Sequence, residues 1–132
     1  MRKASGRAQP TLIGLPIERS AVVSKAVCRA AELLGLTNAA FARTIGVSEA
    51  TASRLRAGAT MLEPDTKPYE LALLLVRLFR SLDAVVAGDE VSRQSWMAAA
   101  NHVLGGVPKD LVQTVTGLVA TAEHVDAARA RV

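Results

Sequence analysis

Hydrophobic residues recur every three to four positions along most of this chain, which is the spacing of one face of a helix. From about residue 19 to residue 34 they fall at i, i+3, i+4 and i+7, which predicts an amphipathic helix that ends before Gly35. Broad apolar stripes predict two further helices, one over about residues 69–86 and one from Pro108 into the C-terminal tail. No strong alternation of apolar and polar residues appears, so the predicted fold class is all-α.

Two short helices are predicted around a glycine turn between residues 37 and 56. Thr37 can cap the first helix, Ser48 can cap the second, and Gly46 can supply the left-handed turn between them. The small residue Ala42 stands where two such helices approach most closely. This pattern predicts a helix-turn-helix.

The predicted helices divide the chain into three segments. Residues 1–18 are predicted to be a flexible basic arm, and residues 19–66 a helix-turn-helix domain with a linker at its end. Residues 67–132 are predicted to form a helical C-terminal domain, with a short helix over about residues 89–99 and a loop before Pro108.

The second helix of a helix-turn-helix enters the major groove of DNA, so its polar side chains are the candidates to read base edges. These candidates are Ser48, Glu49, Thr51, Ser53 and Arg54. Arg43 and Arg56 are predicted to contact phosphate and set the register. Because one half-site gives little specificity, a homodimer on an inverted repeat of the operator is expected.

The distribution of charge supports this assignment. Residues 1–60 hold nine basic and three acidic side chains, a net charge of +6, whereas residues 61–132 hold seven and nine, a net charge of −2. This asymmetry indicates a front half that meets a polyanion. Aromatic residues make up only 3% of the chain, so Ala and Leu must fill the core, which favours closely packed helices.

Several classes of protein are excluded by features that the sequence lacks. Cys28 is the single cysteine and cannot form an internal disulfide, and no signal peptide or membrane-spanning run is apparent, so a cytoplasmic location is expected. His102 and His124 lack the spacing of paired metal ligands. No nucleophile elbow or phosphate-binding loop is present. We therefore expect no enzymatic activity, no cofactor and no metal.

The second half resembles the toxin-binding domain of MbcA/ParS/Xre-type antitoxins. The resemblance rests on Trp96, the run from Asn101 to Pro108, and the spaced Leu111, Gln113-Thr114 and Gly117, behind a leucine-rich helix over residues 71–82. With the Xre-like front it covers about residues 20–132. The sequence departs from the family pattern in two ways. Ala100 stands where the family often has proline, and the front half lacks the glutamines common in Xre-type recognition segments.

The resemblance implies the antitoxin of a type II toxin–antitoxin system. Such proteins neutralise a cognate toxin by direct binding, commonly a RES-domain enzyme that degrades or transfers NAD+, and repress their own operon by binding its promoter. In this family the last helix and tail cover the entrance to the toxin's active site. The positions that the resemblance assigns to toxin contact are Asn101, Gly105, Gly106, Pro108, Gln113, His124, Arg129, Arg131 and Val132.

Two alternatives remain open on the sequence. One is a plain helix-turn-helix transcriptional repressor whose C-terminal domain dimerises or binds a small ligand. The other is an interaction module in which the helix-turn-helix no longer binds DNA. The residues alone also bear on toxin contact: Gly105-Gly106 and Pro108 set a fixed turn before the last helix. That helix is expected to present polar side chains on its less apolar side, namely Gln113, Thr116, Thr121, His124 and Asp126.

Overall fold

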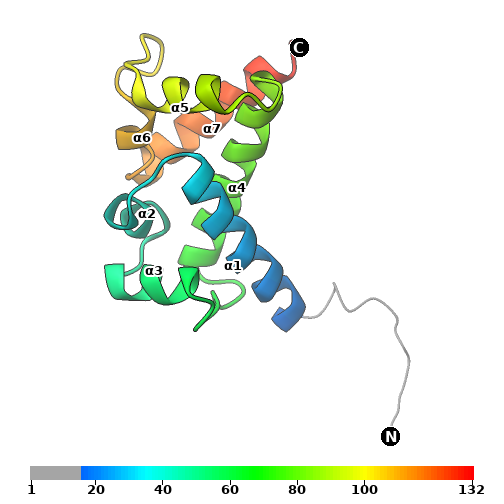
Figure 1. Ribbon diagram of the computed structural model, residues 1–132, viewed down its shortest axis with the longest axis vertical. Coiled ribbons are helices and arrows are strands. Elements are labelled where there is room, and N and C mark those ends of the chain that lie inside the picture. Colours follow the sequence, from blue (N-terminus) through cyan, green and yellow to red (C-terminus); the bar gives the residue numbers. More distant parts are fainter. Residues whose placement is uncertain (1–15) are drawn as a thin grey trace, which may run out of the picture.

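The computed structural model describes residues 16–132, which form seven α-helices and no strand within that range (Figure 1). The all-α prediction is confirmed. The helices are α1 (Pro16–Leu33), α2 (Asn38–Ile45), α3 (Glu49–Arg56), α4 (Lys67–Val85), α5 (Glu90–Ala98), α6 (Pro108–Leu111) and α7 (Val115–Arg129). No helix in the described range is long and apolar enough to cross a bilayer.

The predicted basic arm, residues 1–18, falls almost entirely on the part of the chain that precedes the described residues. Its last three residues were wrongly assigned to the arm, since α1 already begins at Pro16. Proline suits the first position of a helix because its fixed φ is helical and its missing N–H has no partner there.

Short polar side chains start the helices. Thr37, Ser48 and Thr66 each stand just before a helix and accept a hydrogen bond from the backbone N–H three residues further on. Gly46 ends α2 in the left-handed conformation with φ 75°, as predicted for the turn between the two short helices.

The single last helix predicted from Pro108 is wrong, because the chain forms two helices there. α6 ends at Leu111, and Thr114 caps a new helix by accepting a hydrogen bond from the N–H of Gly117 at 3.0 Å. The apolar periodicity runs across this break, so the stripe alone does not reveal it. The two helices remain in contact across the break.

One hydrophobic core runs through both halves of the chain. α4 lies between α1 and α7 and contacts both extensively (Figure 1). The largest fully buried side chains come from α1, α2, α4, α5 and α7 and from the turns after α1 and α6, and include Val27, Leu34, Phe41, Ile45, Leu75, Leu82, Met97, Val112 and Leu118. The division of the sequence at residues 66 and 67 stays a prediction.

A buried arginine ties α5 to the end of α1. Arg93 is 4% exposed; its Nε donates to the carbonyl of Leu33 at 3.0 Å, and its Nη1 donates to Asp83 of α4 at 2.9 Å. Its guanidinium also lies over the ring of Phe79, 5.7 Å from the centroid. Gln94 donates to the same Leu33 carbonyl at 2.7 Å. The end of α1 is therefore held in place just before the helix-turn-helix begins.

Candidate functional site

The α2–α3 pair has the internal packing predicted for a helix-turn-helix. Ala42 and Ala52 are buried where the two helices meet, and Phe41, Ile45 and Leu55 are buried beneath them. Asn38 adds a polar brace, because its Nδ2 donates to the carbonyl of Glu49 and to Oγ of Ser53. The relative orientation of α2 and α3 is thus set by both packing and hydrogen bonds.

Most of the predicted base-reading side chains lie on the solvent face of α3 or at its N-terminus. Glu49, Ser53 and Arg54 are exposed there, and Ser48 is exposed at the cap. Ser48 accepts from the N–H of Thr51 at 3.0 Å, and Thr51 Oγ1 accepts from Nη2 of Arg54 at 3.1 Å. Arg54 is thereby held close to the helix, on the face that a helix-turn-helix presents to DNA.

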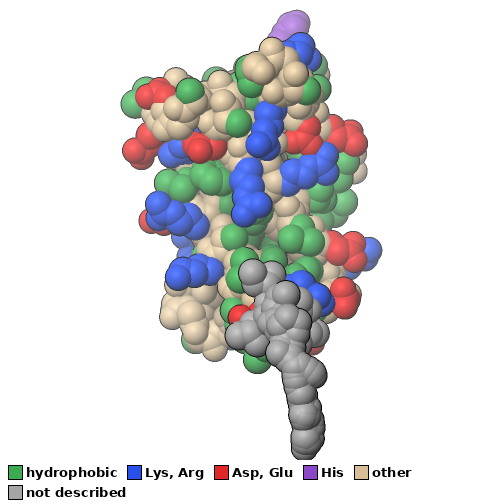
Figure 2. Space-filling view, turned by 90° about the vertical axis from the view of Figure 1, so that its right-hand side faces the viewer, with side chains coloured by type: hydrophobic (Ala, Val, Ile, Leu, Met, Phe, Trp, Pro, Cys, Tyr) green, Lys and Arg blue, Asp and Glu red, His purple; other side chains and the backbone are tan. Residues whose placement is uncertain are grey.

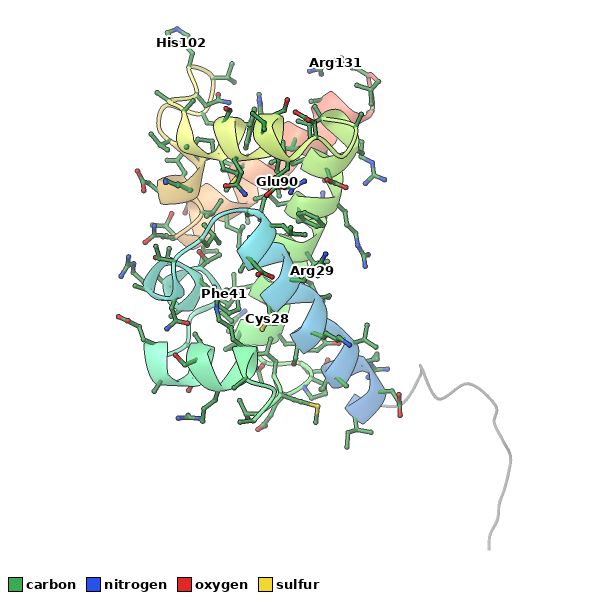
Figure 3. The ribbon with its side chains drawn as sticks, in the orientation of Figure 1. Cys28, Arg29, Phe41, Glu90, His102 and Arg131 are labelled. Carbon is green, nitrogen blue, oxygen red and sulfur yellow. The ribbon has the colours of Figure 1, made fainter. Side chains whose placement is uncertain are left out.

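Arg56 points away from this face. Its guanidinium lies over the ring of Phe41, 5.0 Å from the centroid, and Nη2 donates to the carbonyl of Leu36 at 3.4 Å. It also lines a hollow with Cys28 and Arg29 of α1. Figure 3 shows Cys28, Arg29 and Phe41 on the α1 side of the motif. The predicted phosphate contact of Arg56 would therefore be made beside α1.

Arg43 joins the two predicted binding regions. Its Nε donates to Oε1 of Gln113 at 2.6 Å, across 70 positions of sequence. Gln113 lies in the turn between α6 and α7, where its own Nε2 donates to the carbonyl of Lys109. A residue predicted to contact phosphate and one predicted to contact a toxin are thus bonded to each other. Sequence patterns could not show this contact, because it depends on where the tertiary fold places the turn after α6 relative to α2.

The loop before α6 is closed by Asn101. The backbone N–H of Asn101 donates to the carbonyl of Gly106 at 2.8 Å, and its Oδ1 accepts from the N–H of Leu104 at 2.9 Å. Gly105 has φ 78°, which favours glycine. These bonds close the loop although Ala100 stands in place of the family's proline.

The tip of this loop is open to solvent. Val103 is 77% exposed, and Figure 3 shows His102 projecting from the end of the molecule. Val115, at the start of α7, is 58% exposed. The apolar stripe predicted for the last helix included Val115, and the exposure of this side chain shows that the placement was wrong. Val103 was given no role of its own, and its signal was its position between a histidine and a glycine turn rather than in a helical stripe. Gly106 lies against the side chain of Leu111, and Pro108 is buried at the start of α6.

Several side chains predicted to face outward from α7 are engaged within the protein. Thr121 is fully buried and donates to the carbonyl of Gly117 at 2.7 Å, so its placement on the exposed side was wrong. His124 is half-buried and stacks on Trp96, with ring centroids 6.4 Å apart. Trp96 is itself half-buried and packs against the hydrophobic core.

Asp126 joins α7 to α4. Its carboxylate accepts from the hydroxyl of Ser81 at 2.6 Å and pairs with Arg77. The hydrogen bond from Ser81 is the main reason that the pKa of Asp126 lies below its usual value, and Arg77 lowers that pKa further. Arg129 donates to the same Ser81 hydroxyl at 3.4 Å, whereas Arg131 and Val132 are exposed at the chain end.

The two predicted surfaces meet at the Arg43–Gln113 hydrogen bond and extend from there to opposite ends of the molecule. Figure 1 places α3 at one end, and the 101–106 loop and the C-terminus at the other. Figure 3 shows His102 and Arg131 at that second end, on either side of α5. Cationic side chains are also not confined to the helix-turn-helix: Figure 2 shows Lys and Arg gathered across the face where α1 and α4 lie, and α4 exposes Arg77 and Arg80.

Profiles of two known domains match the chain in this order. The antitoxin Xre-like helix-turn-helix domain matches residues 14–77, and the antitoxin Xre/MbcA/ParS C-terminal toxin-binding domain matches residues 81–131. No curated protein sequence matches the chain. The fold and these matches define the class as a helix-turn-helix antitoxin. Within that class, the chain belongs to the Xre/MbcA/ParS family of antitoxins, whose domains are those of regulators rather than enzymes.

Proposed function

We propose that this chain neutralises a RES-type toxin that consumes NAD+, by direct binding, and represses its own operon through α3, acting in the cytoplasm where that DNA lies. The observation that carries the proposal is the toxin-binding domain matched at residues 81–131 behind a helix-turn-helix. Support for a RES-type partner comes from the resemblance of residues 96–117 to the domain that binds such toxins. The chain itself is proposed to catalyse no reaction.

The placement of the two surfaces supports two simultaneous activities. A toxin bound at the 101–106 loop and the C-terminus would leave the outer face of α3 open, because these regions lie at opposite ends (Figure 1). The decisive experiment is co-purification with the product of the neighbouring gene, followed by an assay of NAD+ loss with and without the antitoxin. Failure to bind that protein, with promoter binding retained, would favour the plain repressor.

Arg54→Ala is expected to lower the preference for operator over random DNA by about 1–3 kcal/mol, because a bidentate contact to guanine would be lost. Arg43→Ala is expected to weaken both DNAs alike, because a phosphate contact carries no sequence information. The measurement is a competition gel shift over a series of salt concentrations, since phosphate contacts make affinity fall steeply with salt.

The matched control for both variants is Arg80→Ala, which removes the same charge from the exposed face of α4, away from α3. It should change affinity less than either variant. Equal loss on operator and random DNA for Arg54→Ala would contradict a base-reading role.

Removing residues 130–132 is expected to weaken inhibition of the toxin at least about tenfold, as expected when a charged interface anchor is lost. The truncation keeps Asp126 and Arg129, whose contacts with Ser81 hold α7 on α4, so the fold should be unaffected. Inhibition is measured by titrating antitoxin into the toxin's NAD+ assay, with thermal unfolding as the control for folding. Full neutralisation by the truncated chain would remove the tail from the mechanism.

A further inference from the structure

Two adjoining hollows lie between α1 and the C-terminal end of α3. Their volumes are about 340 Å³ and about 270 Å³, and they share Cys28 and Arg56. Lys25 lines the first hollow, whereas Arg29 and Glu32 line the second. Figure 3 shows Cys28 and Arg29 together on this part of α1. We call the two hollows together the α1–α3 trench.

The charges of the trench are not neutralised within the protein. Lys25 and Arg29 are exposed one helical turn apart on α1, and neither forms an ion pair with another described residue. The guanidinium of Arg56 meets an aromatic ring and a backbone carbonyl, neither of which carries a charge. These three cations and the carboxylate of Glu32 give the trench a net charge of +2. The trench therefore attracts an anion.

The other groups in the trench indicate what kind of anion fits. Burial raises the pKa of the Cys28 thiol, an effect larger than the lowering by nearby Arg56, so the neutral thiol adds no negative charge between the cations. Among the described residues, no aromatic side chain lines the trench, so a base or a nucleoside would find no ring to stack on. The chemistry suits phosphate groups alone.

The position of the trench favours the phosphates of a DNA strand. Leu55, Arg56 and Ala57 of α3 and its C-cap line it, directly after Arg54 on the predicted reading face. A helix that enters the major groove has a phosphate strand on either side of it. Side chains one turn apart on a helix have Cβ atoms about 6 Å apart. Lys25 and Arg29 can thus reach neighbouring phosphates, which follow one another every ~3.4 Å of the DNA axis along one strand.

We propose that the α1–α3 trench binds the phosphate backbone of DNA beside the major groove that α3 enters. Lys25 and Arg29 of α1 contact this strand together with Arg56, which points away from the outer face of α3. The inference rests on the proposed DNA-binding function and adds α1 to the DNA interface. Because phosphate contacts carry no sequence information, the trench raises affinity for operator and random DNA alike.

The test is a gel shift of the full chain with operator and random DNA over a series of salt concentrations. Lys25→Ala and Arg29→Ala should each lower the slope of log affinity against log salt by about 0.9, which is a loss of roughly eightfold at about 0.1 M salt. Both DNAs should lose affinity alike. The matched control is Arg80→Ala, because Arg80 is exposed on α4 and lines neither hollow. Thermal unfolding of each variant shows whether it is folded.

Removing the carboxylate of the trench should have the opposite effect. Glu32→Gln is expected to raise affinity for both DNAs about twofold at low salt, the effect of removing a like charge roughly 8 Å away in water. Glu123→Gln is its control, because Glu123 is exposed on α7 and lines neither hollow. A damaged fold would lower affinity, so a gain reports on the trench itself.

Several results would overturn the proposed contact. They are an unchanged salt slope for both Lys25→Ala and Arg29→Ala, an equal loss for Arg80→Ala, or no gain for Glu32→Gln. Weaker toxin inhibition by Arg29→Ala with native DNA binding would assign the trench to the toxin instead.

The same titrations separate failure of the trench from failure of the proposed function. A native protein that prefers the operator, with no effect of the α1 variants, would overturn the trench alone. A native protein that binds random DNA through Lys25 and Arg29 but has no preference for its promoter would contradict the repressor function and leave the trench standing.

Discussion

Alanine in place of Gly117 is expected to lower the free energy of unfolding by about 3 kcal/mol, the upper range of overpacking effects. A Cβ at this position would lie 1.9 Å from the carbonyl oxygen of Leu111 and 2.7 Å from its carbon, and these are backbone atoms. α6 and α7 would have to move apart. In an exposed helix, by contrast, glycine to alanine usually stabilises by about 0.5–1 kcal/mol.

The measurement is urea unfolding followed by circular dichroism. Thr116→Ala is the control, because Thr116 is exposed in the same first turn of α7, and its effect should stay within about 0.5 kcal/mol. A Gly117→Ala protein as stable as the native one would show that α6 can move away at no cost. Toxin binding should weaken along with stability, because the displaced segment carries Pro108 and Gln113.

Removal of the Asp83 carboxylate is expected to cost about 3 kcal/mol, the lower range for breaking a buried ion pair. Asp83→Ala leaves Arg93, whose side chain is only 5% exposed, without its counter-charge. Asp83 itself is 39% exposed, so solvent recovers part of the lost interaction. The Leu33 carbonyl and the Phe79 ring remain as the other contacts of the guanidinium.

Adding Arg93→Met to Asp83→Ala should restore part of the stability, because the uncompensated charge is then gone. The control is Glu123→Ala, which removes an exposed carboxylate from α7 and should have little effect. Urea unfolding of the native protein, of the single variants Asp83→Ala and Arg93→Met, and of the double variant gives the coupling energy of the pair. An Asp83→Ala protein with native stability would mean that Arg93 does not need its carboxylate.

Local patterns were enough to predict most helices and the helix-turn-helix. The spacing of apolar residues and the caps at Thr37 and Ser48 act within a few positions of the chain, so they can be read without the fold. The prediction of a single helix from Pro108 onward was wrong because it relied on this local spacing alone. The apolar stripe continues across Thr114, and only its cap reveals the new helix.

The candidate site was less accessible to sequence reasoning. Polarity alone placed Thr121 and Asp126 on an outward face of the last helix, but both side chains bond within the protein. Asn38, which braces α2 against α3, gave no signal beyond being a polar residue in a first helical turn. Which polar residues are free to bind a partner depends on which helices pack beside them.

The sequence by itself determined the helical class and the family. It also determined that a DNA-binding-type motif precedes a toxin-binding-type domain. These conclusions were possible because periodicity, capping and spaced motifs are properties of short segments. The tertiary structure alone decided that Arg93 is buried against the end of α1, that Gly117 must remain glycine, and that Arg43 meets Gln113. These contacts join residues far apart in the chain or depend on how neighbouring helices turn. Close packing of the helices of residues 16–132 around one core determines which of those groups can touch.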